Sequence, residues 1–260
     1  NDSNSSSLVK LVQDHDYIFH LAGNTKIQSS KEQENHYLFS WVGPLQEILN
    51  SMIGTKKILL FASSCSVYGN SPSLPVDANT KEDPLTSYDL AKVTCDNLIK
   101  YYRDVYGVLC SSLRFSNIYG PLKASRPSDR KVINKILDHI HKSKEVTLVE
   151  DGRFYRNYVH VFDCAEMLIH IAQEIENTSP ILLGCSNENL MFKEVIGLLL
   201  QCYKDRFNEK IDIKYGMEKR FLTDLRQFSA KPSIVFQQNF NFKFALKDGF
   251  RELVNELEEY

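Results

Sequence analysis

A short apolar run, Ile58 to Ala62, is the feature that most constrains how this chain folds. Five consecutive apolar residues have the length and composition of a strand buried on both faces, which is typical of parallel sheets. Small hydroxyl residues follow at Ser63 and Ser64, and the triplet Val-Tyr-Gly comes at residues 67–69. We therefore expect Ser64 to stand where a buried strand ends.

A second feature is the pair Tyr88 and Lys92, which lie four residues apart at the start of a helical pattern. Residues i and i+4 share one helix face, so the phenol and the ammonium point into the same space, where Ser64 faces them. A lysine beside a phenol favours the phenolate and lowers the tyrosine pKa towards neutrality. A serine within reach of the same substrate oxygen then shares its proton, which predicts oxidation of an alcohol or reduction of a ketone. Taken alone, the spacing is also that of a surface lysine one turn from a half-buried tyrosine.

The composition narrows the class of protein. With 260 residues, 43% hydrophobic and 25% charged, the chain can bury a full core. Its net charge of −2 gives no electrostatic reason to expect nucleic acid or an anionic membrane as a partner. No apolar run approaches the roughly 20 residues that span a bilayer, and nothing at the N-terminus has the pattern of a signal peptide. Six cysteines without C-x-x-C pairs, and seven histidines without ligand spacing, predict reduced buried thiols, a cytoplasmic location and no metal site.

The order of apolar strand, Ser-Ser, Val-Tyr-Gly, proline-bearing loop and Tyr-x-x-x-Lys resembles the extended short-chain dehydrogenase/reductase family. These enzymes depend on NAD(P) and act on nucleotide-activated sugars. The resemblance implies an α/β fold with a Rossmann-like, doubly wound parallel sheet in residues 1–121. A smaller substrate-binding lobe, interleaved with the last sheet elements, would occupy residues 122–260. It also implies that Ser64, Tyr88 and Lys92 are catalytic and that the protein is a homodimer.

The resemblance further implies NAD as cofactor, with NADP as the other possibility. The segment 16–23 is similar to the strand that the family writes as D-hydrophobic-H-L-A-A, whose small residues let the backbone approach the dinucleotide. The residues expected to bind the cofactor are Leu21, Ala22, Gly23, Ser63, Tyr88, Lys92 and Phe115.

A nucleotide-diphosphate sugar is the substrate that the resemblance implies. Segment 114–121 is similar to the family's R-x-x-N-x-Y-G-P, and segment 153–163 to its G-x-x-x-R-D-[FY]-[VI]-[HY]-V-x-D, with Asn157 in place of the usual Asp. A guanidinium fork suits a diphosphate. The residues expected to bind substrate are Ser30, Ser66, Asn117, Arg156 and Arg220; the Arg220 segment lacks the family's Pro-Gly.

The residues after Ser64 bear on the reaction. Dehydratases of the family place Asp-Glu directly after the catalytic hydroxyl residue, and decarboxylases keep an acid just before Val-Tyr-Gly. This chain has Cys65 and Ser66 there, which cannot serve as acids. We therefore expect a 4-epimerase ahead of a 4-ketoreductase, with hydride transfer at sugar C4, although Ser40 replaces an asparagine that normally helps to shape the site.

The Gly-rich turn that holds the pyrophosphate in this family should precede Asp16, but no glycine occurs before that residue. We expect a longer chain, because without the preceding strands the 16–22 strand would be an exposed apolar edge. The alternative is a non-catalytic or regulatory member that binds a sugar nucleotide and has lost the cofactor loop. The sequence leaves open the sugar, the base and the choice between NAD and NADP.

Overall fold

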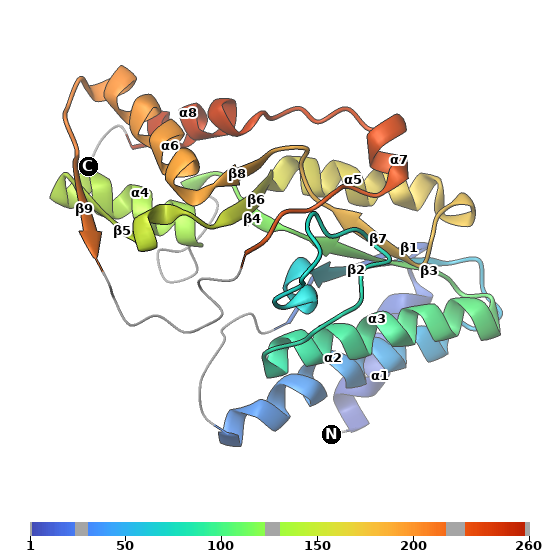
Figure 1. Ribbon diagram of the computed structural model, residues 1–260. Coiled ribbons are helices and arrows are strands. Elements are labelled where there is room, and N and C mark those ends of the chain that lie inside the picture. Colours follow the sequence, from blue (N-terminus) through green and yellow to red (C-terminus); the bar gives the residue numbers. More distant parts are fainter. Residues whose placement is uncertain (1, 24–30, 123–130, 217–226, 258–260) are drawn as a thin grey trace.

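The computed structural model describes residues 2–23, 31–122, 131–216 and 227–257, and it has three sheets (Figure 1). The strands are β1 (Tyr17–His20), β2 (Ile58–Ser64), β3 (Leu109–Phe115), β4 (Asn117–Tyr119), β5 (Glu145–Val149), β6 (Tyr155–His160), β7 (Ile181–Gly184), β8 (Asn189–Met191) and β9 (Asp212–Gly216). The α-helices are α1 (Asp2–Gln13), α2 (Lys31–Met52), α3 (Ser87–Tyr106), α4 (Val132–Ser143), α5 (Val161–Gln173), α6 (Phe192–Phe207), α7 (Ile234–Gln238) and α8 (Leu246–Asn255).

The main sheet has four parallel strands in the order β1-β2-β3-β7. At its centre, β2 pairs with β3 along its whole length, from Ile58 opposite Leu109 to Ser64 opposite Phe115. The middle of β2 is completely buried, because helices cover both faces of the sheet. The carboxyl ends of β1, β2 and β3 therefore lie along one edge of the sheet.

Helices α1, α2 and α3 cover one face of this sheet and α5 covers the other (Figure 1). On the first face, α2 and α3 pack together and enclose Trp41, Leu45, Leu49, Ala91 and Cys95 against β2. On the second face, α5 packs its apolar side against β2 and β3. This three-layer arrangement is the α/β fold that the resemblance implied.

A smaller lobe follows β3 in the sequence and contains the other two sheets. One has the order β4-β6-β8 and the other pairs β5 with β9. Helices α4, α6 and α8 pack around a second core that includes Leu137, Leu199, Tyr203, Phe250 and Leu253. The lobe therefore has an apolar core of its own, beside the main sheet.

The sequence predicts a helix from Cys164 with Asp163 as its N-cap, because aspartate is a favoured capping residue. This prediction was wrong, since α5 begins at Val161 and its N-cap is His160. The Asp163 carboxylate instead accepts hydrogen bonds from the backbone N–H groups of Lys243 and Phe244. A proline at residue 44 predicts a bend or a break in the helix, and because α2 continues through Pro44 it has no break there.

Strand β1 is the outer strand of the main sheet in the part of the chain that is described. Tyr17, Phe19 and Leu21 in and beside it are 55%, 39% and 56% exposed. An outer strand with exposed apolar side chains is a place where a further strand can pair.

The six cysteines are free and buried, as the sequence predicted. None of the helices in the described ranges is both long enough and apolar enough to cross a membrane. Nor do the described histidines, cysteines and carboxylates form a group of three or more that could hold a metal ion.

Two glycines with positive φ differ in the space around them, so substituting each with alanine distinguishes backbone strain alone from strain combined with steric overlap. Gly107 is the left-handed C-cap of α3, and an added Cβ there has nothing within 4 Å. At Gly69 (φ +53°) an added Cβ would lie 1.9 Å from the carbonyl oxygen of Asp83. We expect Gly107→Ala to lower the free energy of unfolding by about 1–2 kcal/mol. Gly69→Ala should lower it by about 3 kcal/mol or more, because overlap adds to strain. Urea denaturation measures both, and equal losses would contradict this account.

Candidate active site

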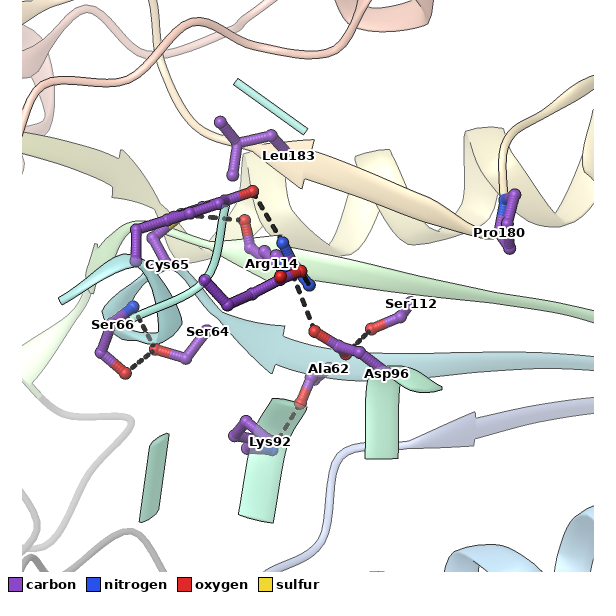
Figure 2. A network of polar contacts seen from close by, with 12 residues as sticks. Ala62, Ser64, Cys65, Ser66, Lys92, Asp96, Ser112, Arg114, Pro180 and Leu183 are labelled. Carbon is purple, nitrogen blue, oxygen red and sulfur yellow. Dashed lines mark hydrogen bonds and ion pairs between the residues drawn. The ribbon is translucent and has the colours of Figure 1, made fainter. Parts of the chain in front are cut away.

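Ser64 is the last residue of β2, and its hydroxyl begins the turn that follows. The turn is a short 3-10 helix, Cys65–Tyr68, with Ser64 as its N-cap. The Ser64 Oγ accepts a hydrogen bond from the Ser66 backbone N–H at 3.2 Å and lies 2.9 Å from the Ser66 Oγ. These contacts hold the Ser64 hydroxyl at the carboxyl edge of the sheet (Figure 2).

Tyr88 lies in the first turn of α3, and a capping box fixes that turn. The Thr86 side chain accepts from the Asp89 backbone N–H at 3.1 Å, and the Asp89 carboxylate accepts from the Thr86 backbone N–H at 3.1 Å. The sequence Thr-x-x-Asp therefore satisfies two backbone donors that a helix start leaves open. The reciprocal pair fixes the orientation of the turn and so places Tyr88.

The structure brings Ser64 and Tyr88 together. Burial raises the pKa of Tyr88 to about 12, and a hydrogen bond with Ser64 only partly offsets this. The expectation that Lys92 brings this pKa towards neutrality is therefore wrong for the protein without ligands. The Lys92 Nζ lies 5.7 Å from the centre of the tyrosine ring, and the charges that act on this pKa are those of Asp89 and Asp96, which raise it further.

Lys92 comes one turn after Tyr88 and is 2% exposed. Its Nζ donates to the carbonyl oxygen of Ala62, in β2, at 2.6 Å (Figure 2). Burial lowers the Lys92 pKa to about 7, although the nearby Cys95 and Asp96 raise it. A buried lysine with this pKa exchanges its proton in the physiological range.

A buried ion pair joins Arg114 in β3 to Asp96 in α3 (Figure 2). The Arg114 Nε donates to Asp96 at 2.8 Å, and the Ser112 hydroxyl donates to the other carboxylate oxygen at 2.5 Å. Both charged side chains are 2% exposed. Burial lowers the Arg114 pKa, but Asp96 and Tyr68 more than offset this and raise it, so the guanidinium stays charged.

The same guanidinium holds the turn that follows Ser64. It donates to the Tyr68 hydroxyl at 2.9 Å and to Glu82 at 2.5 Å. The Cys65 thiol, in turn, donates to the backbone carbonyl of Arg114 at 3.1 Å. Arg114 thereby joins the turn after β2, the loop before α3 and α3 itself, and so ties the strand end that carries Ser64 to the helix that carries Tyr88 and Lys92.

The residues expected to bind cofactor lie along the edge formed by the strand ends. Leu21, Ala22 and Gly23 are exposed at the end of β1, whereas Ser63 and Phe115 are buried at the ends of β2 and β3. The Lys92 ammonium has three N–H donors but one hydrogen-bond acceptor among the described residues, so it has donors left for ligand hydroxyls. An exposed strand end beside a partly satisfied ammonium fits a dinucleotide ribose.

Of the residues expected to bind substrate, Ser66 lies in the turn after β2, whereas Asn117 and Arg156 lie in the smaller lobe. The Asn117 side chain donates to the Asn157 carbonyl at 3.0 Å, and the Arg156 guanidinium lies 4.4 Å from the centre of the Phe154 ring. Asn157 is fully buried and bonds the backbone of segment 186–188 through its side chain, which is a structural role. Ser30 and Arg220 lie outside the described residues.

Three residues beside the site were not among the site residues predicted from the sequence. Trp41 packs its indole near Lys92, and Asp96 and Arg114 form the ion pair. A signal for Asp96 was available, because it lies one turn after Lys92 on the same helix face. No sequence pattern indicated that Trp41 contacts Lys92.

Residues 2–184 match the model of the NAD dependent epimerase/dehydratase family. A putative UDP-glucose 4-epimerase of Methanocaldococcus jannaschii is 29% identical over 206 residues, which are 76% of this chain and 62% of that protein. The chain spans about half the length of other curated relatives that it matches.

Solved structures of similar proteins agree in fold. A UDP-N-acetylglucosamine 4-epimerase from Methanobrevibacter ruminantium, in complex with UDP-N-acetylmuramic acid, superposes with a TM-score of 0.83 at 22% identity, over 96% of this chain and 78% of that one. A UDP-glucuronic acid 4-epimerase from Bacillus cereus, in complex with UDP-glucuronic acid and NAD, has a TM-score of 0.78 at 20% identity, over 96% and 77%. At these identities the likeness establishes the fold.

The lowered pKa of Lys92 makes stability depend on pH. The folded state holds this proton less tightly than the unfolded state, so the free energy of unfolding should rise with pH above about 7. The slope for one proton is at most roughly 1.4 kcal/mol per pH unit. Above pH 9 the buried thiols oppose the rise, because burial raises the pKa of Cys95 and Cys110 to about 12. Urea titrations from pH 7 to 8.5 should show the rise, and Lys92→Met should abolish it; the same slope in both proteins would refute it.

Removing one member of the Arg114–Asp96 pair should leave a buried charge without its partner. We expect Arg114→Met to lower the free energy of unfolding by about 3–5 kcal/mol. The double variant with Asp96→Asn should lose clearly less than the sum of the single losses. Arg251→Met is the matched control, because Arg251 pairs with Asp248 at the surface, where such a pair contributes at most about 1 kcal/mol. The pair is not coupled if the losses in the free energy of unfolding are additive, or if Arg251→Met loses as much as Arg114→Met.

Proposed function

This chain belongs to the NAD dependent epimerase/dehydratase family, and from that premise we propose that it carries the active site of a nucleotide-sugar 4-epimerase. The observation that carries the proposal is the contact of Ser64, at the end of β2, with Tyr88 in the first turn of α3, with Lys92 one turn further on. These elements come from separate parts of the chain, and together they supply the groups that proton transfer at an alcohol carbon requires.

Each residue has a distinct task in this proposal. The Ser64 hydroxyl orients the C4 oxygen of the sugar, and the Tyr88 phenol exchanges a proton with it. With a pKa of about 12 the phenol is protonated at neutral pH and serves as the acid towards a C4 carbonyl. The reverse step needs the phenolate, and positive charge brought close to the ring lowers its pKa.

NAD is the cofactor that fits this edge of the sheet, and it supplies hydride acceptance and return at C4. The exposed end of β1 at Leu21, Ala22 and Gly23 would lie along the dinucleotide. The Lys92 ammonium would donate to ribose hydroxyls, while Ser63 and Phe115 would line the nicotinamide side.

Epimerase is favoured over dehydratase because of the turn after Ser64. A dehydratase needs acids at this turn, but Cys65 and Ser66 stand there. Burial raises the Cys65 pKa, and its thiol is used in a hydrogen bond to Arg114, so it is not a proton donor for substrate. A 4-ketoreductase uses the same three catalytic residues, and product analysis separates it from an epimerase.

The substrate we propose is a nucleoside-diphosphate sugar held by the smaller lobe. Arg156 is the diphosphate ligand in this proposal, because its guanidinium is positioned by the Phe154 ring and by a hydrogen bond to the Tyr155 carbonyl, and the planar fork of a guanidinium suits a diphosphate. Asn117 and Ser66 would contact the sugar, and Ser30 and Arg220 remain proposals outside the described residues.

We also propose a homodimer, because the outer side of α3 carries an apolar stripe. Leu90, Tyr101 and Val105 are 46%, 49% and 57% exposed and share one helix face. Two copies of this stripe facing each other would bury it. Molar mass from light scattering tests this, and a monomer at micromolar concentrations would argue against it.

The test of the function is conversion of UDP-sugars at C4 in the presence of NAD, followed by NMR of the products. Tyr88→Phe should reduce the rate by at least about a hundredfold, since a general acid–base group contributes roughly 10²–10⁴. Tyr17→Phe is the control and should keep the full rate, because Tyr17 is 55% exposed at the amino end of β1, away from the site.

Two outcomes would redirect the proposal. Binding of UDP-sugar without any turnover, in a protein that binds NAD, would leave a non-catalytic sugar-nucleotide-binding protein. Formation of a 4-reduced product with net consumption of NADH would identify a 4-ketoreductase.

A further inference from the structure

The Lys92 ammonium lies in an aromatic cage, by which we mean the rings of Trp41 in α2 and Phe61 in β2. Its Nζ is 3.3 Å from the centre of the Trp41 ring and 4.5 Å from that of Phe61. The three side chains are 2%, 1% and 0% exposed, so the contacts are shielded from water. A cation on the face of an indole is favourable, and most so where it has lost its hydration shell.

The cage is rigid because the indole is held on several sides. The Trp41 ring meets Phe61 edge to face at 6.0 Å and Tyr88 at 6.4 Å, measured between ring centres. On a further side it packs on Gly23, where an added Cβ would lie 2.1 Å from the ring. Trp41 therefore touches the end of β1, the middle of β2 and the start of α3 at once.

Hydrogen bonds alone do not satisfy the Lys92 ammonium. The carbonyl of Ala62 is the one acceptor that its Nζ reaches among the described residues, and an ammonium has three N–H groups. Without the rings the ammonium would be almost wholly desolvated, with a single partner, in an apolar layer. The aromatic faces supply the electrostatic attraction that water would otherwise provide.

We propose that Trp41 is a positioning residue for Lys92: its indole face, together with Phe61, holds the ammonium against the Ala62 carbonyl, one helical turn from Tyr88. This inference rests on the proposed function for its meaning in catalysis, but the contact itself is testable without any activity. It assigns a role in the site to a residue of α2, the helix whose Ser40 departs from the family pattern.

The groups around Lys92 fix the direction of its pH response. His20 faces it from β1, and Tyr88, Cys95 and Asp96 face it from α3; the α2 and β2 residues in contact are the cage rings and the Ala62 carbonyl. Burial lowers the pKa of His20 to about 4, with Lys92 adding to the effect, so the imidazole is neutral at pH 7. Because the indole stabilises the charged lysine, its loss should lower the Lys92 pKa below about 7.

The first experiment is NMR of protein labelled with ¹³C-lysine. Protons over the face of an aromatic ring resonate upfield, so the ε-methylene signal of Lys92 should stand apart from the signals of the other lysines. Lys92→Met identifies the signal by removing it. Trp41→Leu should move the signal most of the way back, and Trp41→Phe should keep part of the shift. A Lys92 signal at the ordinary position in the wild type would overturn the proposal.

The second experiment follows the protonation of Lys92. Its NMR titration should have a midpoint near 7 in the wild type, about one unit lower in Trp41→Leu, and between these in Trp41→Phe, where one unit is a tenfold change in proton affinity. Because Trp41 is the one tryptophan of the chain, wild-type fluorescence should show the same midpoint. Lys92→Met should remove that transition and His20→Asn should keep it. Unchanged midpoints in both Trp41 variants would refute the positioning role.

Activity separates this inference from the function on which it rests. If both hold, Trp41→Leu lowers kcat and shifts its pH profile by the same amount as the lysine titration, while KM for the nucleotide sugar changes little. A shifted lysine in a protein without activity would support the cage and reject the enzyme. An active enzyme in which the Lys92 titration is the same in the wild type and the Trp41 variants would support the enzyme and reject the cage. If Trp41→Leu fails to fold, the ε-methylene shift of the wild type and the Lys92 titration of Trp41→Phe still test the positioning role.

Discussion

The position of the site depends on one buried ion pair. Arg114 extends from the central strand β3 and meets Asp96 on α3, which ties the helix to the sheet at a fixed register. The same guanidinium reaches Tyr68 and Glu82, so the turn after β2 and the loop before α3 are held to the same point. A charged group in this place is costly unless all of its donors are used, and here Asp96, Tyr68 and Glu82 take up donors on Nε and on both terminal nitrogens.

Two buried cations between α3 and the main sheet are satisfied in opposite ways. Arg114 has carboxylate partners and keeps its charge, which suits a permanent structural joint. Lys92 has a carbonyl and two rings, so its charge is only marginally favoured near neutral pH. Exchanging the two residue types would not preserve either role, because arginine cannot give up its proton and lysine cannot make the forked contacts.

Much of the fold followed from local patterns, whereas the chemistry of the site did not. The start of helix α3 was predicted from the helical pattern at Tyr88 and Lys92, and the helix ends at Gly107, its left-handed cap. The strand β2 was predicted from its apolar run, and it ends at Ser64, as expected. The raised pKa of Tyr88 was not predictable, because burial depends on how α2 packs on α3. The contact of Trp41 with Lys92 joins residues about fifty positions apart and leaves no periodic trace in the sequence.

The parallel pairing of the main sheet also bears on how the site comes into being. Ile58 pairs with Leu109 and Ser112 with Ile181, so neighbouring strands come from distant parts of the chain. Closing such long loops costs entropy before any contact repays it, which makes chains of this topology slow to fold. Ser64 and Tyr88 acquire their geometry only after β2, α3 and β3 have assembled. During synthesis the site therefore cannot form until β3 has been made.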